Sequence, residues 1–332
     1  MGLSARVVGT GSIGTRYLNA LALLTGSRPI AVPIGGVLRD PRLAEVATVE
    51  SLNEPDKPHV DLCVIATNTN RHLEDAAGFR GSTDLLLIEK PLSFSTQSLR
   101  GFDCSRPTAE LAVATPLRFM EGFGAVQATL AAVGEITGVS VECRSWLPSW
   151  RPGTDVRRSY SSHPTYGGVL LDLVHEIDYC LQLFGIPVGL NAALSRDSVL
   201  GLSSESSAHL LWRYGAYDLQ MVLDYVSRPP SRRLTVYGTR KSLAWDLLEA
   251  TVTIWDHGQG RVEVAAFPDD LDRDMLLLRQ ILATAARSGD ARVSSLEQAW
   301  QAVAVCDLAK VSSRQSGVTL AAGAALEVAS AG

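Results

Sequence analysis

The sequence predicts an α/β protein with two parts: an N-terminal doubly wound parallel sheet and a C-terminal α/β domain with an open, mainly antiparallel sheet. Near-continuous apolar runs alternate with helical stretches over about the first 115 residues, which is typical of a parallel sheet covered on both faces. After Pro116, alternating apolar and polar residues recur with few helical stretches between them. That pattern favours antiparallel strands with helices on one face.

The expected elements follow from these patterns. In the N-terminal part we expect strands over 6–9, 60–66 and 85–88, a helix over 13–24, and at most one short helix within 39–53. In the C-terminal part we expect strands within 135–144 and 206–226, a strand, turn and strand over 233–245, and a further short strand that ends at Trp255. We also expect helices over 167–184, 272–288 and 295–312. The predicted domains are 1–117 and 118–322, followed by a small-residue tail, 323–332, that we expect to be mobile.

Composition narrows the class of protein. The chain has 332 residues, 46% of them hydrophobic, and a net charge of −5, so neither nucleic acid nor an anionic membrane is an expected partner. No apolar stretch reaches the roughly 18 residues that span a bilayer, and the N-terminus lacks a signal-peptide pattern. Five widely spaced cysteines without a CxxC pair suit a reducing compartment. We therefore predict a cytoplasmic protein, and we predict no metal site.

A glycine-rich turn follows the first strand and opens the first helix. Its GxGxxG spacing is that of dinucleotide-binding turns. Gly9 permits the tight turn, Gly11 lets the backbone approach a pyrophosphate, and Gly14 lets helix and strand pack closely. Ser12 and Ile13 complete the helix start, whose amides favour an anion. The turn predicts NAD or NADP as cofactor, and the alternative is a purely structural turn.

The residue that would hold the ribose 2′-hydroxyl is expected about 20 residues further on. That count reaches 34–36, where the sequence has no carboxylate. Arg39 would favour the 2′-phosphate of NADP, whereas Asp40 would favour NAD. Both residues are equally compatible with solvated positions in a loop, so the choice stays open.

Two further segments carry titratable groups. Lys90 comes directly after an apolar strand, where ligands bind in open α/β sheets, and a lysine partly removed from water there can transfer protons. On the predicted helix 167–184, Asp172 and His175 lie three residues apart on one face. A carboxylate beside an imidazole suits a general acid/base. The alternatives are a solvated lysine and a core histidine satisfied by Asp172 or Asp178.

Three segments together, GTGSIG, EKPLS and GGVLLDLVHEIDY, resemble the glucose–fructose oxidoreductase, inositol dehydrogenase and MocA-type (Gfo/Idh/MocA) family in order and spacing over about 300 residues. The resemblance implies a Rossmann domain and hydride transfer between NAD(P) and a secondary alcohol or ketone of a sugar, cyclitol or anionic sugar derivative. It implies that Lys90 contacts substrate and nicotinamide ribose and that His175 is the acid/base. It also implies a homo-oligomer, a dimer or a tetramer.

The same resemblance assigns further residues. Asp172 becomes the neighbour of His175 in catalysis, although many members place the aspartate four residues before the histidine rather than three, so its role stays open. Thr67, Asn68 and His72 match the family's loop after the fourth strand, with Asn68 where proline is usual. Together with Glu89 they are predicted to bind cofactor.

A second stretch comprises Leu117–Phe119, Trp146–Pro152 and Asp155–Ser161. It resembles a subgroup of the family that is associated with surface-sugar and nonulosonic acid pathways. Arginine forks bind carboxylate or phosphate, and aromatic rings cover sugar faces, so the stretch predicts an anionic sugar derivative as substrate. The alternative is a loop packed by its tryptophans and ion pairs. The predicted substrate residues are Arg118, Trp150, Arg151, Asp155, Arg157 and Tyr160.

Two other functions remain compatible with the sequence. One is a non-catalytic, dinucleotide-binding regulatory protein of the same fold. The other is an enzyme that uses tightly bound NAD for a redox-neutral reaction. The sequence leaves open the substrate, the direction of reaction and the oligomeric state.

Overall fold

The computed structural model describes residues 3–99, 102, 109–196, 199–268, 275, 277–279 and 292–322. The chain divides into two compact units: unit 1 comprises Met1–Pro116 and Asp272–Trp300, and unit 2 comprises Leu117–Leu271 and Gln301–Gly332. Each unit is built around one sheet. The helix expected over 272–288 falls largely outside the described residues, and the tail 323–332 falls entirely outside them.

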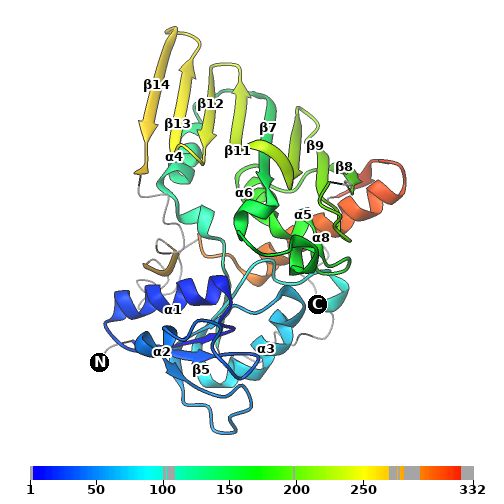
Figure 1. Ribbon diagram of the computed structural model, residues 1–332. Coiled ribbons are helices and arrows are strands. Elements are labelled where there is room, and N and C mark those ends of the chain that lie inside the picture. The colour runs from blue at the N-terminus through cyan, green and yellow to red at the C-terminus, as the bar shows by residue number, and fades with distance from the viewer. Residues whose placement is uncertain are drawn as a thin grey trace. The chain divides into compact units, whose positions relative to one another are not determined.

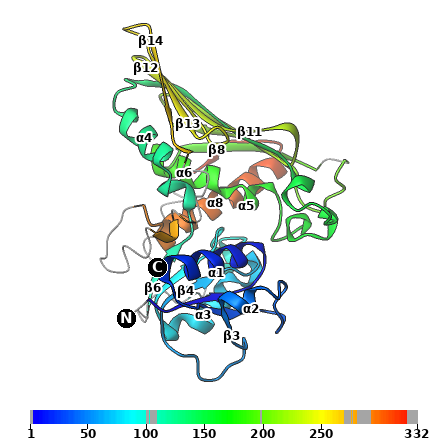
Figure 2. The ribbon, with the colours of Figure 1, turned by 60° about the vertical axis from the view of Figure 1, so that its left-hand side comes forward.

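Unit 1 contains a six-stranded sheet in the order β3-β2-β1-β4-β5-β6, and every pairing within it is parallel. From β1 the chain builds outward first to one side and then to the other. Helices α1 and α3 cover opposite faces (Figure 2), so β1, β4 and β5 are buried on both sides and read as continuous apolar runs. The elements are β1 (Ala5–Val8), α1 (Ser12–Thr25), β2 (Ile30–Val32), α2 (Leu43–Val46), β3 (Thr48–Val49), β4 (Val60–Ile65), η1 (Thr69–Arg71), α3 (His72–Phe79), η2 (Arg80–Ser82), β5 (Thr83–Ile88), η3 (Gln97–Leu99) and β6 (Glu110–Val113).

Unit 2 contains a nine-stranded sheet in the order β14-β13-β12-β11-β7-β10-β9-β8-β15 (Figure 1). Among the described pairings only β7 with β10 is parallel. The elements are η4 (Pro116–Phe119), α4 (Glu121–Leu130), β7 (Ile136–Trp146), η5 (Leu147–Trp150), η6 (Val156–Arg158), η7 (Tyr160–Ser162), α5 (Val169–Asp172), α6 (Val174–Phe184), β8 (Gly189–Ser195), β9 (Ser207–Arg213), β10 (Asp218–Asp224), β11 (Val226–Gly238), β12 (Lys241–Asp246), β13 (Thr251–Asp256), β14 (Arg261–Ala266), α8 (Leu296–Arg314) and β15 (Leu320–Ala321).

One face of the unit 2 sheet carries the core. Seen nearly edge-on, the sheet has α4, α5, α6 and α8 along the same face (Figure 2). Side chains that point toward these helices are buried, for example Val139, Val141 and Cys143 of β7, whereas Ser140 and its alternate neighbours are more exposed. This alternation produces the period-2 pattern of the sequence. The predicted fold class, a doubly wound parallel sheet followed by a mainly antiparallel one, is confirmed.

One predicted element is wrong. Residues 167–184 do not form a single helix, because the backbone leaves the helical region at Leu173 (φ −98°, ψ 26°) and separates the four-residue α5 from α6. The physical reason is tertiary: Asp172, on the last turn of α5, and Glu176, on the first turn of α6, are each bound to other parts of unit 2. The three-residue spacing therefore does not place Asp172 and His175 on one face of a continuous helix.

Every helix in the described ranges is too short or too polar to span a bilayer.

Candidate functional site

In unit 1, three strands end side by side at one edge of the sheet. Val8 of β1 pairs with Ile65 of β4, and Ile65 pairs with Ile88 of β5. The next residues continue the register: the Ala66 amide donates to the Val8 carbonyl at 2.8 Å, and the Glu89 amide donates to the Ile65 carbonyl at 2.9 Å. The chain adds β2 and β3 on one side of β1 and then β4, β5 and β6 on the other side. The strand order therefore changes direction between β1 and β4, and an α/β sheet binds ligands at such a switch point.

The glycine turn at this edge depends on missing side chains. Gly9 has φ +94°, and a Cβ there would lie 2.6 Å from the Ala66 carbonyl oxygen. A Cβ on Gly14 would lie 1.9 Å from the carbonyl oxygen of Gly9, so helix α1 meets the turn as closely as two backbones can. Gly11 differs, because a Cβ there would have no atom within 4 Å. Its backbone is open to an approaching ligand.

These residues fit a dinucleotide. Helix α1 begins directly after Gly11 and presents its first amides at the turn, which is the arrangement that binds a pyrophosphate. Ser12 is exposed and Ile13 half-buried at this helix start. Beside the turn, the Thr67 hydroxyl is buried without a hydrogen-bond partner in the described part of the chain, and Asn68 next to it is exposed.

The loop after β2 bears on the choice between NAD and NADP. β2 ends at Val32 and runs into a turn that is closed by the Gly36 amide and the Pro33 carbonyl at 3.1 Å. Arg39 is exposed. Both carboxylate oxygens of Asp40 accept from the Arg42 guanidinium, at 2.9 and 2.7 Å, and these bonds hold the pKa of Asp40 below its usual range. The Asp40 carboxylate, which would favour NAD, is thus ion-paired with Arg42.

His72 is placed behind the ligand edge. Its side chain is 1% exposed, with Nδ1 2.8 Å from the Pro91 carbonyl oxygen and Nε2 3.1 Å from that of Thr67. Burial lowers the pKa of His72, and the two carbonyls oppose that shift. Since both ring nitrogens face backbone carbonyls, the geometry favours a role in holding the loops after β4 and β5 rather than contact with a cofactor.

Lys90 follows β5 and is partly exposed. The preceding residue, Glu89, is 7% exposed and does not face outward. Its Oε1 accepts from the Tyr17 hydroxyl at 2.5 Å, and its Oε2 accepts from the Lys90 backbone amide at 3.1 Å. Glu89, predicted to bind cofactor, is thus linked to helix α1.

In unit 2, Asp172 is the centre of a buried polar cluster. The side chain is 5% exposed, and its Oδ2 accepts from the Ser161 hydroxyl at 2.7 Å and the Tyr225 hydroxyl at 2.5 Å. Burial and the charge of Asp172 raise the pKa of Tyr225 and that of Tyr160. Both tyrosines therefore stay protonated and can donate. Tyr225 was missed at the level of sequence, where it reads as one more apolar residue at a strand end.

Aromatic side chains border this cluster. The Trp150 ring meets that of Tyr225 edge to face, with ring centroids 5.5 Å apart at 90°, and Trp150 is 40% exposed. The Arg151 guanidinium lies 5.0 Å from the centroid of the Tyr160 ring. Three predicted substrate residues, Trp150, Arg151 and Tyr160, are thus brought together around Asp172.

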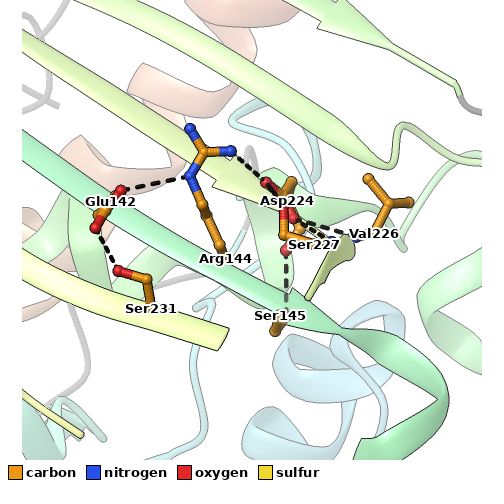
Figure 3. Close-up of polar contacts among 7 residues, drawn as sticks. All are labelled: Glu142, Arg144, Ser145, Asp224, Val226, Ser227 and Ser231. Atoms are coloured by element: carbon orange, nitrogen blue, oxygen red, sulfur yellow. Dashed lines mark hydrogen bonds and ion pairs between the residues drawn. The ribbon is translucent and has the colours of Figure 1, made fainter. Parts of the chain in front are cut away.

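A second polar cluster surrounds Asp224, the last residue of β10 (Figure 3). Asp224 is 2% exposed, and its Oδ1 accepts from the backbone amides of Val226 and Ser227 at 3.2 and 2.9 Å. Arg144 of β7 donates to Asp224 Oδ2 at 2.9 Å. The cluster lies where β11 shifts register against β7, between Val226 and Ser231. It therefore holds the irregular backbone beside Tyr225 in one conformation.

Two arginines flank the helix that carries His175. His175 is half-buried in the first turn of α6. Glu176 accepts from Arg232 of β11 at 2.6 Å, with side-chain exposures of 0% and 11%. Asp178 accepts from Nε and Nη2 of Arg118 at 2.9 and 2.7 Å. Burial raises the pKa of Asp178, and Arg118 opposes that shift.

The remaining predicted substrate residues lie elsewhere. Arg118 is 2% exposed and its fork is held by Asp178, which favours a structural role. Arg157 and Asp155 pair with each other on an exposed turn, at 2.9 and 3.0 Å. Neither residue is brought to the Asp172 cluster by an interaction in the described structure.

Fold and site together define a two-unit α/β chain whose N-terminal unit has the geometry of a dinucleotide-binding Rossmann domain. Residues 128–244 match the family model of the GFO/IDH/MocA C-terminal domain, a stretch of unit 2 that runs from the end of α4 into β12. The family resemblance seen in the sequence is confirmed. No curated protein sequence matches the chain.

Solved structures share the fold over nearly the whole chain. A levoglucosan dehydrogenase in complex with NADH and levoglucosan is 14% identical, with a TM-score of 0.80, over 97% of this chain and 100% of that one. An oxidoreductase from Agrobacterium radiobacter in complex with NAD+, L-tartaric acid and magnesium is 16% identical, with a TM-score of 0.78, over 98% and 99%. A UDP-N-acetylglucosamine 3-dehydrogenase from Acidithiobacillus ferrooxidans is 18% identical, with a TM-score of 0.72, over 94% and 98%.

Proposed function

We propose that the protein is an NAD(P)-dependent oxidoreductase that interconverts a secondary alcohol and a ketone on a sugar-like substrate. The observation that carries the proposal is the edge of the unit 1 sheet where β1, β4 and β5 end. Gly11, with its open backbone, follows β1, and the partly exposed Lys90 follows β5. Both of these strands pair with β4. The levoglucosan dehydrogenase, which shares the fold and was solved with NADH and levoglucosan, supports both the cofactor and the substrate class. The UDP-N-acetylglucosamine 3-dehydrogenase, which also shares the fold, supports the substrate class.

Lys90, His175 and Asp172 have different roles in the proposed reaction. The nicotinamide, when bound, supplies the hydride acceptor or donor. His175 takes the hydroxyl proton of the alcohol, and Lys90 polarises the same oxygen, which stabilises alkoxide charge as it develops. Asp172, held by Ser161 and Tyr225, binds a substrate hydroxyl or fixes the loop that does so.

The cluster around Asp172 indicates the kind of substrate. Trp150 offers an aromatic surface of the sort that covers sugar rings. The Arg151 guanidinium lies over the Tyr160 ring, 5.0 Å from its centroid, and guanidinium groups bind carboxylates and phosphates. We therefore propose an anionic sugar derivative, with Arg151 as the group that binds the charge.

The first test is a calorimetric titration of the purified protein with NAD(H) and with NADP(H), after any copurified nucleotide has been identified. Clear binding of either form supports the proposal. Absence of binding, with no nucleotide already present, would mean that the glycine turn is structural and that the oxidoreductase proposal is wrong. A nucleotide that cannot be dialysed away would favour a redox-neutral reaction instead.

The second test assigns the reacting groups. Lys90→Ala and His175→Ala are each expected to lower kcat by roughly 100-fold or more, as loss of an acid/base group does, with little change in cofactor affinity. Lys57→Ala and His209→Ala remove the same chemical groups from other places and serve as controls. A non-catalytic regulatory protein would bind cofactor normally yet turn over none of the anionic or neutral sugars supplied.

A further inference from the structure

We propose that Tyr17 is a positioning residue for Lys90 and acts through the carboxylate of Glu89. The inference rests on the proposed function, in which Lys90 contacts substrate and cofactor. It concerns a residue that no motif singles out, because Tyr17 occupies an ordinary inward position of helix α1 and is 0% exposed.

The hydrogen bonds form a direct chain from α1 to Lys90. The Tyr17 hydroxyl donates to Glu89 Oε1 at 2.5 Å, and the Lys90 backbone amide donates to Glu89 Oε2 at 3.1 Å. Both bonds are made to a carboxylate that is 7% exposed. Hydrogen bonds to a buried, charged acceptor are the strong kind, so both donors contribute to the orientation of Glu89.

The other side of Lys90 is held as well. The Pro91 carbonyl oxygen lies 2.8 Å from Nδ1 of His72, whose Nε2 lies 3.1 Å from the carbonyl oxygen of Thr67. Lys90 therefore stands between two residues that are tied to buried side chains, one on α1 and one on α3. Both helices start just after loops of the proposed cofactor edge, so the position of the lysine is coupled to that of the cofactor loops.

Tyr17→Phe removes one oxygen atom and leaves the packing of the ring in place. The buried carboxylate of Glu89 then loses the hydrogen bond that the Tyr17 hydroxyl donates to its Oε1. It must turn or take up a proton, and either response changes the contact with the Lys90 amide. The lysine side chain is then no longer held where the reaction needs it.

The control is Thr83→Val. Thr83 is the first residue of β5, at the end of the strand opposite Lys90, and is 0% exposed. Its hydroxyl donates to the Leu85 carbonyl at 2.9 Å. The substitution removes a buried hydroxyl hydrogen bond from the same strand without altering shape, and so reports the general cost of such a loss.

The first readout does not need activity. The protein is labelled with formaldehyde and cyanoborohydride over a range of pH, and the rate at each lysine is measured by peptide mass spectrometry. Lys57, Lys241 and Lys310, the only other lysines of the chain, are internal standards. Tyr17→Phe should change the Lys90 rate severalfold and leave the standards unchanged, whereas Thr83→Val should change none of the four.

The second readout is turnover. Tyr17→Phe should lower kcat by roughly 10- to 100-fold, the cost of a misplaced catalytic group, with KM and the cofactor dissociation constant nearly unchanged. Glu89→Gln, which keeps the shape of the side chain but removes its charge, should act in the same direction.

If Tyr17→Phe lowers the melting temperature as Thr83→Val does but leaves both the Lys90 labelling rate and kcat at the wild-type value, the tyrosine is merely structural and the inference is wrong. If no sugar is turned over by the wild-type protein, the proposed function fails, yet the labelling experiment still decides whether Tyr17 positions Lys90.

Discussion

The glycine turn offers a pair of substitutions that should separate folding from binding. Gly14→Ala would place a Cβ 1.9 Å from the Gly9 carbonyl oxygen, about 1 Å inside any contact that real Cβ atoms make. The obstacle is backbone, and Gly9 is itself held because its amide donates a hydrogen bond to the Val32 carbonyl at 2.9 Å. We expect a loss of at least about 3 kcal/mol in the free energy of unfolding, the upper end for overpacking.

Gly11→Ala should behave differently. The new Cβ would have no atom within 4 Å, and the backbone angles of Gly11 (φ −74°, ψ −166°) are open to alanine. The cost in stability should stay below about 1 kcal/mol, the usual effect at a helix N-cap. The methyl group would, however, stand where a pyrophosphate approaches the backbone. We expect dinucleotide affinity to fall roughly 10- to 100-fold, about 1.4 to 2.7 kcal/mol.

The assay measures both quantities on each variant: urea denaturation without nucleotide, and titration with NADH and NADPH followed by fluorescence energy transfer from tryptophan. Wild-type affinity in Gly11→Ala would refute the assignment of the turn as a pyrophosphate site. Wild-type stability in Gly14→Ala would contradict the close approach of α1 to the turn.

Further predictions follow from other contacts. Arg118→Met leaves the buried carboxylate of Asp178 without its ion pair and should lower the free energy of unfolding, measured by urea denaturation, by about 3–5 kcal/mol. The double variant with Asp178→Leu should regain most of that free energy. Equal losses in the two variants would contradict this prediction. Tyr225→Phe removes a donor from buried Asp172 and should cost about 1–3 kcal/mol and lower kcat, which a melting curve and initial rates check. Arg39→Gln should weaken NADPH binding about tenfold and spare NADH if the exposed guanidinium binds a 2′-phosphate; equal effects on both nucleotides would exclude that role.

Local patterns predicted most of the fold because burial acts on neighbouring residues in a regular way. A strand covered on both faces must be apolar throughout, and β4 and β5 show this in the sequence as they do in the structure. The single short helix expected within 39–53 is the four-residue α2. Where a long-range contact competes with local spacing, the local rule fails, as at Leu173 between α5 and α6.

The candidate site was predictable only where chemistry is visible in a short segment. The glycine spacing and Lys90 after a strand are of that kind. Tyr17 and Tyr225 were not singled out because an inward tyrosine has the same sequence signature whether its hydroxyl donates to a buried carboxylate or fills a core. Arg118 was predicted to bind substrate because a fork of donors suits an anion, and the anion it meets is Asp178, 60 residues away.

The sequence by itself determined the parallel and antiparallel sheets, the glycine turn and the residue types available for chemistry. These depend on periodicity and on steric needs of the backbone, which act over a few residues. Only the tertiary structure decided which charges are used up in ion pairs, which tyrosines donate to Glu89 and Asp172, and where the helix before His175 breaks. Those outcomes depend on groups far apart in the chain that must find partners once water is excluded, and no local pattern records the partner.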